Sequence, residues 1–340
     1  MQRPLALSFM KEKKEGKGED SSPLSLVHKN HIYVGVFDGM GGSGASLYKT
    51  EDGTEHTGAY IASRVVCECV KSILEKSIES TTETTVLLKN LKENIQEVLR
   101  QEITKYQSKE KSALRSSLLR TFPTTMALCS CETNDSTICI DSIWAGDSRN
   151  YLLTDEGLFQ ISVDDLTPQQ DPMENLKNDA PLSNCICADR DFKLNHQYIE
   201  IKSPCCVISA TDGCFGYSIS PMHFEALLLE CLNNSKNVEE WSDAICDEIN
   251  KITGDDFSFS AFILGCNDYK EFKDRLKKRK SIIEKTLKNS NNCISEIERY
   301  KKIIEENETK LSDKKVKLEI ILQEGWDKYK VQYMSKLSVE

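Results

Sequence analysis

The sequence predicts an α+β protein in which strands and helices form separate layers, followed by a long helical extension. Short apolar runs typical of strands occur in blocks, and the helical stretches between them are too few for a repeating strand–helix–strand array. The composition changes near residue 268, since all eight prolines lie before that point. Hydrophobic residues make up 39% of the 340 positions, which is enough for a sizeable core.

The individual elements of the first part follow from the spacing of its apolar residues. We expect strands where apolar, aromatic and β-branched residues cluster between turn residues, at 31–39, 124–131, 137–147, 150–162, 204–213 and 257–266. We expect helices where apolar residues recur at intervals of three and four, at 59–77, 85–106 and 220–234. Ser220 is a suitable N-cap for the last of these, with Pro221 in its first turn.

The segment after residue 268 is rich in Lys, Glu, Ile and Leu, and Gly325 is its only glycine. Apolar residues occupy six of seven positions spaced seven apart, at 276, 283, 290, 297, 304, 311 and 318, where only Ser290 is polar. Three structures fit this pattern: a coiled coil between chains, a long helix packed on its own domain, or a helical hairpin broken at Asn289–Asn292. We therefore divide the chain into a domain at 1–268 and a tail at 269–340 that serves packing or a partner.

Charge and cysteine usage narrow the class of protein. The net charge of −10 argues against binding to nucleic acid, because the phosphate backbone would be repelled. No run of about 18 apolar residues is present, so we expect no membrane span. The fourteen cysteines are spread along the chain, and the first twenty residues lack a signal-peptide pattern. We therefore expect free thiols and a cytoplasmic protein.

Acidic residues recur where the expected strands end or begin. Asp38 and Asp212 each follow an apolar strand and precede a glycine, Asp147 lies in a turn between strands, and Asp255 with Asp256 precedes the last strand. A tight turn in which the Asp bonds its own backbone explains any one of these. Their recurrence favours a shared site instead. Carboxylate oxygens are the ligands preferred by Mg²⁺ and Mn²⁺.

Five strings in order resemble the signature of the metal-dependent protein phosphatases of the PP2C (PPM) class. They are Glu19-Asp20, Asp38-Gly39-Met40-Gly41-Gly42, Gly146-Asp147-Ser148-Arg149, Thr211-Asp212-Gly213 and Asp255-Asp256. The Asp-Gly-Met-Gly-Gly form is common in bacterial members. The resemblance covers roughly residues 10–266 and leaves the tail outside.

This resemblance implies a β-sandwich of two antiparallel sheets flanked by helices, with two Mn²⁺ or Mg²⁺ ions, and a weaker third, at one end. The implied metal ligands are Glu19, Asp20, Asp38, the Gly39 carbonyl, Asp212 and Asp255, with Asp147 at the third ion. Asp38, Asp212 and Asp255 would carry catalysis, with Asp38 bridging the two metals. A water bridging the ions would attack a phosphoserine or phosphothreonine directly. The implied partners are a phosphoprotein substrate and a cognate serine/threonine kinase.

Several positions depart from the family pattern. Met40 stands where many members carry a proton-donating His, and methionine has no proton to give. The phosphate-binding Arg has no match, so Lys14 or Lys17 would have to act as a point charge. Asp256 replaces the usual Asn, and Gly216 replaces an acid of the third site. The alternative function is a catalytically weak or inactive scaffold with a coiled-coil interaction tail.

Overall fold

A computed structural model describes residues 5–50, 53–77, 83–106, 120–134, 137–168, 171–177 and 180–336. Within these ranges the main strands form two five-stranded sheets, which we call sheet A and sheet B. Sheet A contains, in spatial order, β1 (Leu5–Lys11), β12 (Phe257–Leu264), β11 (Cys205–Ala210), β8 (Arg149–Thr154) and β9 (Gly157–Gln160). Sheet B contains β10 (Asn195–Ile201), β7 (Thr137–Ala145), β6 (Met126–Asn134), β3 (His31–Val36) and β2 (Leu24–His28).

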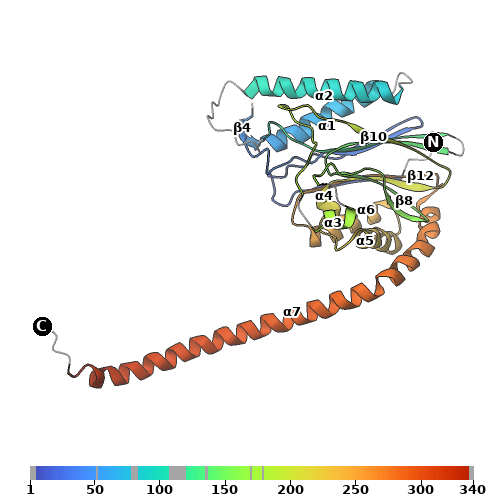
Figure 1. The fold of residues 1–340 in the computed structure, drawn as a ribbon. Coiled ribbons are helices and arrows are strands. Elements are labelled where there is room, and N and C mark those ends of the chain that lie inside the picture. Colours follow the sequence, from blue (N-terminus) through green and yellow to red (C-terminus); the bar gives the residue numbers. More distant parts are fainter. Residues whose placement is uncertain are drawn as a thin grey trace. The chain divides into compact units, whose positions relative to one another are not determined.

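The two sheets pack face to face, and helices cover their outer faces (Figure 1). All neighbouring strands in both sheets pair antiparallel. The helices α1 (Gly58–Ser77) and α2 (Thr84–Tyr106) lie on sheet B, whereas α5 (Pro221–Asn234) and α6 (Val238–Ile252) lie on the side of sheet A. The shorter elements are β4 (Leu47–Lys49), β5 (Glu55–Thr57), α3 (Pro172–Asn175) and α4 (Asp212–Phe215).

The period of two in the strands explains these layers. In β3, Ile32 and Val34 belong to the core between the sheets, while Tyr33 packs in a second core under α1 and α2. Polar side chains join the sheets inside the sandwich, and Asn150 makes the most such hydrogen bonds among the described residues. Asn150 of β8 donates hydrogen bonds to the carbonyl oxygens of Leu128 (3.1 Å) and Ile143 (3.2 Å) in sheet B. Such a satisfied buried amide fixes how one sheet sits on the other.

The predicted fold class, a sandwich of two antiparallel sheets flanked by helices with a long helical extension, is confirmed. The expected strands and helices are present with small shifts at their ends, and Ser220 caps α5. The run expected at 150–162 is divided into the hairpin β8–β9, where Gly157 has a φ of +144°. The elements not predicted from the sequence are β1, β2, β10 and α6, together with the short β4, β5, α3 and α4.

The extension forms one helix, α7 (Tyr269–Tyr333), which runs without a break through Asn289–Asn292. The proposed hairpin is therefore wrong. The chain divides into two compact units, Met1–Ile283 and Glu284–Glu340. The first turns of α7 belong to the first unit, where Phe272 and Leu276 are buried. The predicted boundary at residue 268 stays a prediction, as does the coiled coil.

Candidate functional site

The predicted acids gather at one end of the sandwich because the strand ends that carry them meet there. Asp38 follows β3, Asp212 begins α4 directly after β11, and Asp255 lies just before β12. Asp147 lies in the turn from β7 to β8. A cleft of about 330 Å³ is lined by Asp147, Asp212 and Asp255. The site therefore combines acids carried by both sheets.

Asp20 and Asp38 form the most closely coupled pair of the site. Their carboxyl groups share a hydrogen bond, and Asp20 is 2% exposed. Burial, together with the nearby charges of Asp212 and Asp256, raises the pKa of Asp20 to about 7. Burial and the charges of Asp20, Asp212 and Asp147 raise the pKa of Asp38 well above its ordinary value. In the protein without bound cations, the crowded and buried position of the pair thus disfavours its fully charged form.

Backbone and hydroxyl contacts join the Asp20 segment to both sheets. The Thr211 hydroxyl donates to the Asp20 carboxylate at 2.9 Å. The Ser21 N–H donates to the Phe37 carbonyl at 3.0 Å, and the Ser258 hydroxyl donates to the Ser21 carbonyl at 2.8 Å. Phe37 follows β3, while Ser258 belongs to β12. The segment is therefore held between the ends of the two sheets.

Glu19 is oriented by residues at the start of α1. The Thr57 hydroxyl donates to its carboxylate at 2.5 Å, and the Ser63 hydroxyl donates to its backbone carbonyl at 2.5 Å. Arg64 donates to the carbonyls of Gly18 (3.2 Å) and Glu19 (3.3 Å). Burial raises the pKa of Glu19, although the Thr57 hydrogen bond opposes this. The sequence reading missed Arg64, whose signal was an arginine beside a serine on the apolar side of a helix.

The glycines of the signature strings are required for close approach. A Cβ on Gly39 would lie 2.6 Å from the carbonyl oxygens of both Glu19 and Ala59. A Cβ on Gly213 would lie 1.9 Å from the carbonyl oxygen of Asp256. Both positions follow an acid of the site, so the glycines allow the acid-bearing segments to touch.

The backbone at Asp38 and Gly39 is fixed by the start of the neighbouring strand. The Thr124 hydroxyl donates to the Asp38 carbonyl at 2.6 Å, and the Thr125 N–H donates to the same oxygen at 2.8 Å. The next ladder bond runs from the Met40 N–H to the Pro123 carbonyl at 3.2 Å. These bonds use Asp38 and Met40 on either side of Gly39. The Gly39 carbonyl is therefore positioned by its neighbours.

The remaining acids differ in their surroundings. Burial and the charges of Asp212 and Asp164 raise the pKa of Asp147 to about 8. Asp255 as a whole residue is exposed, but partial removal of water from its carboxylate, together with the charge of Asp256, raises its pKa. Asp256 accepts hydrogen bonds from the backbone N–H groups of Lys13 (2.7 Å) and Glu19 (2.8 Å). Asp147 and Asp255 face the cleft, whereas Asp256 anchors the N-terminal loop.

The two lysines predicted to bind phosphate lie in a turn of this loop, and both are exposed. The Lys17 N–H donates to the Lys14 carbonyl at 3.0 Å. The lysine that contacts the site segment is Lys13, whose ammonium group donates to the Thr253 carbonyl at 2.6 Å. A phosphate role for Lys14 or Lys17 stays a prediction.

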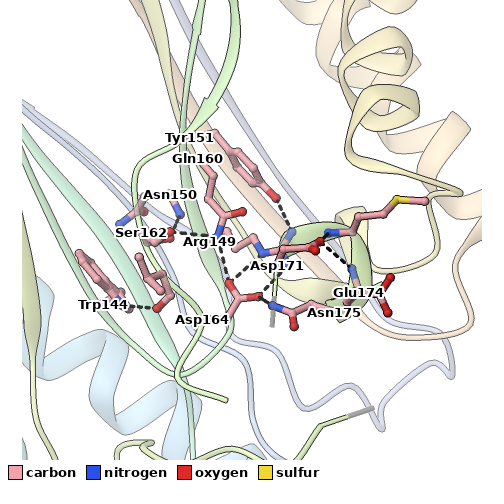
Figure 2. Close-up of polar contacts among 12 residues, drawn as sticks. Trp144, Arg149, Asn150, Tyr151, Gln160, Ser162, Asp164, Asp171, Glu174 and Asn175 are labelled. Atoms are coloured by element: carbon pink, nitrogen blue, oxygen red, sulfur yellow. Dashed lines mark hydrogen bonds and ion pairs between the residues drawn. The ribbon is translucent and has the colours of Figure 1, made fainter. Parts of the chain in front are cut away.

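Arg149 lines the cleft, but its positive charge is already used in an ion pair within the protein. Arg149 forms a two-point ion pair with Asp164, with distances of 2.9 and 2.6 Å, and both residues are buried (Figure 2). Its guanidinium also lies 4.2 Å from the centre of the Phe215 ring. Asn175 and Gln160 donate to the same carboxylate. Arg149 belongs to one of the signature strings, but its partner Asp164 was not predicted from the sequence.

The donor set of the site suits hard divalent cations. Its side-chain ligands are carboxylates, and their raised pKa values reflect crowded negative charge that a cation would relieve. No group of three or more His, Cys, Asp or Glu side chains in the described ranges is already arranged as a metal site. Asp20 and Asp38 are instead hydrogen-bonded to each other, and Asp256 to the backbone. The residues therefore fit the cations in the chemistry of their donor atoms.

The profile of one protein family matches most of the domain. The match is to protein phosphatase 2C and covers residues 16–250, which include the acids from Glu19 to Asp212. The chain belongs to the protein phosphatase 2C family. The predicted family is thus confirmed, and with it the enzyme class, a protein serine/threonine phosphatase. A search of curated proteins gave no match.

Solved phosphatase 2C structures show the same fold at low sequence identity. The serine/threonine phosphatase Stp1 from Staphylococcus aureus is 18% identical with a TM-score of 0.55, covering 78% of this chain and 96% of that one. A bacterial serine phosphatase is 16% identical (TM-score 0.54; coverage 78% and 100%). The PstP/Ppp phosphatase of Mycobacterium tuberculosis is 16% identical (TM-score 0.51; coverage 77% and 97%). Among the described helices of this chain, none is long and apolar enough to cross a membrane.

Proposed function

We propose that this phosphatase 2C domain hydrolyses phosphoserine and phosphothreonine in proteins with two Mn²⁺ or Mg²⁺ ions. The observation that carries the proposal is the buried carboxyl pair of Asp20 and Asp38, whose pKa values are raised by the nearby charge of Asp212. Asp212 itself lines the 330 Å³ cleft together with Asp147 and Asp255, and we call this the acidic cleft. Two buried carboxyl groups whose pKa values are raised by crowding are a place where a bound cation would relieve the repulsion between them. Retention of these acids favours an active enzyme over a scaffold that has lost its chemistry.

The residues that would hold the cations all offer oxygen atoms. Asp38, the Gly39 carbonyl, Asp212 and Asp255 would hold the two main ions. Asp20 and Glu19 would hold a cation directly or through its waters. Asp147 is the candidate for a weaker third ion. When bound, two divalent cations would supply an activated water and neutralise charge on the phosphate.

The residues around the acids determine which groups could donate a proton to the leaving oxygen or bind the phosphate. Met40 cannot donate a proton to the leaving oxygen, so that proton would come from solvent. Arg149 is already paired with Asp164, so its charge is largely compensated. Lys14 and Lys17 would add positive charge at the edge of the site without a two-point contact. We therefore expect a weaker grip on phosphate than an arginine fork would give.

The remaining proposals concern partners and place. We propose a phosphoprotein as the substrate and a serine/threonine kinase as the enzyme whose phosphorylation this protein reverses. We also propose a cytoplasmic location. For the tail, we propose pairing with a second copy. Residues Ile297, Ile304, Leu311 and Leu318, spaced seven apart, are each 53–56% exposed on α7. An apolar heptad row of this kind favours a coiled coil.

Hydrolysis of p-nitrophenyl phosphate tests the enzyme proposal. We expect turnover that requires Mn²⁺ and is removed by EDTA. Asp38→Asn should abolish it, whereas Asp155→Asn, in the exposed turn between β8 and β9, should leave it unchanged. Absence of Mn²⁺-dependent turnover in the full chain, or full activity of Asp38→Asn, would favour the scaffold alternative.

A further inference from the structure

A second cleft of about 450 Å³ adjoins the acidic cleft. It lies where β8, β9 and α3 face α5 and the first turns of α7. The two clefts share Arg149, Leu176 and Phe215 as lining residues. A ligand seated in the acidic cleft would therefore lie next to the second cleft. Its volume falls within the usual range for sites that bind small ligands or side chains.

The wall of the second cleft is aromatic and closely packed. Tyr151 contacts Phe215 and Phe224 with ring centroids 5.8 and 5.6 Å apart, and Phe215 lies 6.2 Å from Phe224. All three rings are buried, so this wall is fixed by packing. Met173 and Met222 line the cleft from α3 and α5. Methionine is flexible and polarisable, which suits a rim that adapts to different apolar groups.

The charged groups that line the cleft are already paired. Arg149 is held by Asp164, as Figure 2 shows, and Arg279 forms a two-point pair with Glu225 at 2.6 and 2.9 Å. Asp171 caps α3 by accepting from the N–H groups of Met173 and Glu174. These groups therefore have no strong demand for a charged ligand. The surface that remains to be covered is apolar.

The exposed apolar surface continues from one cleft toward the other. Tyr217 lines the acidic cleft and is 48% exposed, while Met222 lines the second cleft and is 43% exposed. Tyr217 lies on the short segment that leads from α4 into α5, and Met222 lies in the first turn of α5. Exposed apolar groups beside a polar site are typical of a surface that contacts a ligand.

We propose that the second cleft binds a large apolar side chain of the substrate, a few residues from its phosphoserine or phosphothreonine. This inference rests on the proposed function, because the phosphate would occupy the acidic cleft. The occupant is a peptide segment, since the second cleft adjoins the acidic cleft and shares Arg149, Leu176 and Phe215 with it. Met222 and Met173 would determine the preference for apolar residues.

The test compares phosphothreonine peptides that differ at one position. Leu is placed in turn at each of the three residues on either side of the phosphothreonine, in an otherwise Ser and Gly sequence, and compared with Ser. Turnover is measured with Mn²⁺, and binding is measured separately by fluorescence anisotropy of labelled peptides. The variants are Met222→Glu, Met222→Leu and Ile219→Glu. Ile219 is 57% exposed on the segment between α4 and α5 and does not line either cleft, so it controls for the added charge.

We expect Leu at one position to raise kcat/KM and affinity about tenfold, a typical effect of filling an apolar pocket. Met222→Glu should remove this advantage, whereas Met222→Leu and Ile219→Glu should retain it. The proposal is overturned if no position prefers Leu, or if the preference survives Met222→Glu. It is also overturned if the labelled peptides with Leu bind no more tightly than those with Ser in the anisotropy measurement. Failure of the proposed function is seen separately, as absent hydrolysis of p-nitrophenyl phosphate. In that case the anisotropy measurement still shows whether the cleft prefers peptides with Leu.

Discussion

The carboxylate of Asp256 accepts a 2.8 Å hydrogen bond from the backbone N–H of Glu19. Its other oxygen accepts from the Lys13 N–H at 2.7 Å. The extra negative charge at this position therefore has a structural use, because it closes the N-terminal loop onto the start of β12. Both oxygens are needed, which an asparagine could not provide with its single acceptor.

Asp256→Asn should loosen the loop that carries Glu19 and Asp20. The amide retains one acceptor and loses the other, so we expect a loss of about 1 kcal/mol in the free energy of unfolding. Affinity for Mn²⁺ should fall severalfold, because the loop is less well positioned. Urea unfolding and calorimetric titration measure the two effects. An unchanged unfolding midpoint would show that these hydrogen bonds do not hold the loop.

The cation-free protein should lose stability as pH rises from about 4 to 8. The pKa of Asp20 is raised to about 7 and that of Asp147 to about 8, so the folded state binds more protons than the unfolded state in this window. Stability then decreases with pH. Added Mn²⁺ should reverse this, giving a thermal shift that grows from pH 5 to pH 8. A thermal shift that is independent of pH would contradict the crowded-carboxylate description.

Asp38→Asn should stabilise the cation-free protein at pH 8 while removing the Mn²⁺ effect. The substitution removes one charge from a buried group of acids, and its amide can still donate to Asp20. We expect a higher melting temperature in EDTA and little further increase with Mn²⁺. Asp155→Asn is the matched control and should behave as the parent chain does. A lower melting temperature in EDTA would show that the carboxyl at position 38 stabilises the fold.

Breaking the pair of Arg149 and Asp164 should be costly. Both side chains are 3–4% exposed, so removing either leaves a buried charge uncompensated. Asp164→Ala should therefore lower the free energy of unfolding by about 3–5 kcal/mol. Asp155→Ala, at an exposed position, should change it by less than about 0.5 kcal/mol. Urea denaturation followed by circular dichroism checks both values.

The tail should make the protein dimeric in solution. Leu311→Glu and Leu318→Glu place charges in the apolar row of α7, whereas Ser312→Glu places the same charge beside it. We expect sedimentation of the full chain to give a dimer that the first two variants dissociate and the third leaves intact. A monomeric parent chain at tens of micromolar would mean that the row serves a different partner.

How well the sequence predicted each strand depended on its place in a sheet. The expected strands include the central ones, whose residues are almost all buried, such as β11 and β12. The missed strands β1, β2 and β10 are all at sheet edges. Edge strands carry polar and charged residues on their open side, as the Asn-His-Gln-Tyr-Ile-Glu-Ile of β10 does, which obscures the apolar pattern.

The site was predictable where it depended on local sequence and not where it depended on long-range contacts. The positions of Asp38 and Asp212 beside glycines were visible as strand-end motifs, and the structure brings them to one end of the sandwich. The partners of Glu19 on α1, Ser63 and Arg64, are 44 and 45 residues away in sequence, and the partner of Arg149, Asp164, is 15 residues away. Nothing in the local pattern around Asp164 or Arg64 could indicate which group each would meet.

The chain crosses from sheet A to sheet B between β1 and β2, and that crossing carries Glu19 and Asp20. Asp38 then belongs to the end of sheet B, and Asp212 to the end of sheet A. A cation held by these acids would connect the ends of the two sheets at this end of the sandwich. Cation binding and closure of the two layers are then one linked equilibrium, so each should strengthen the other.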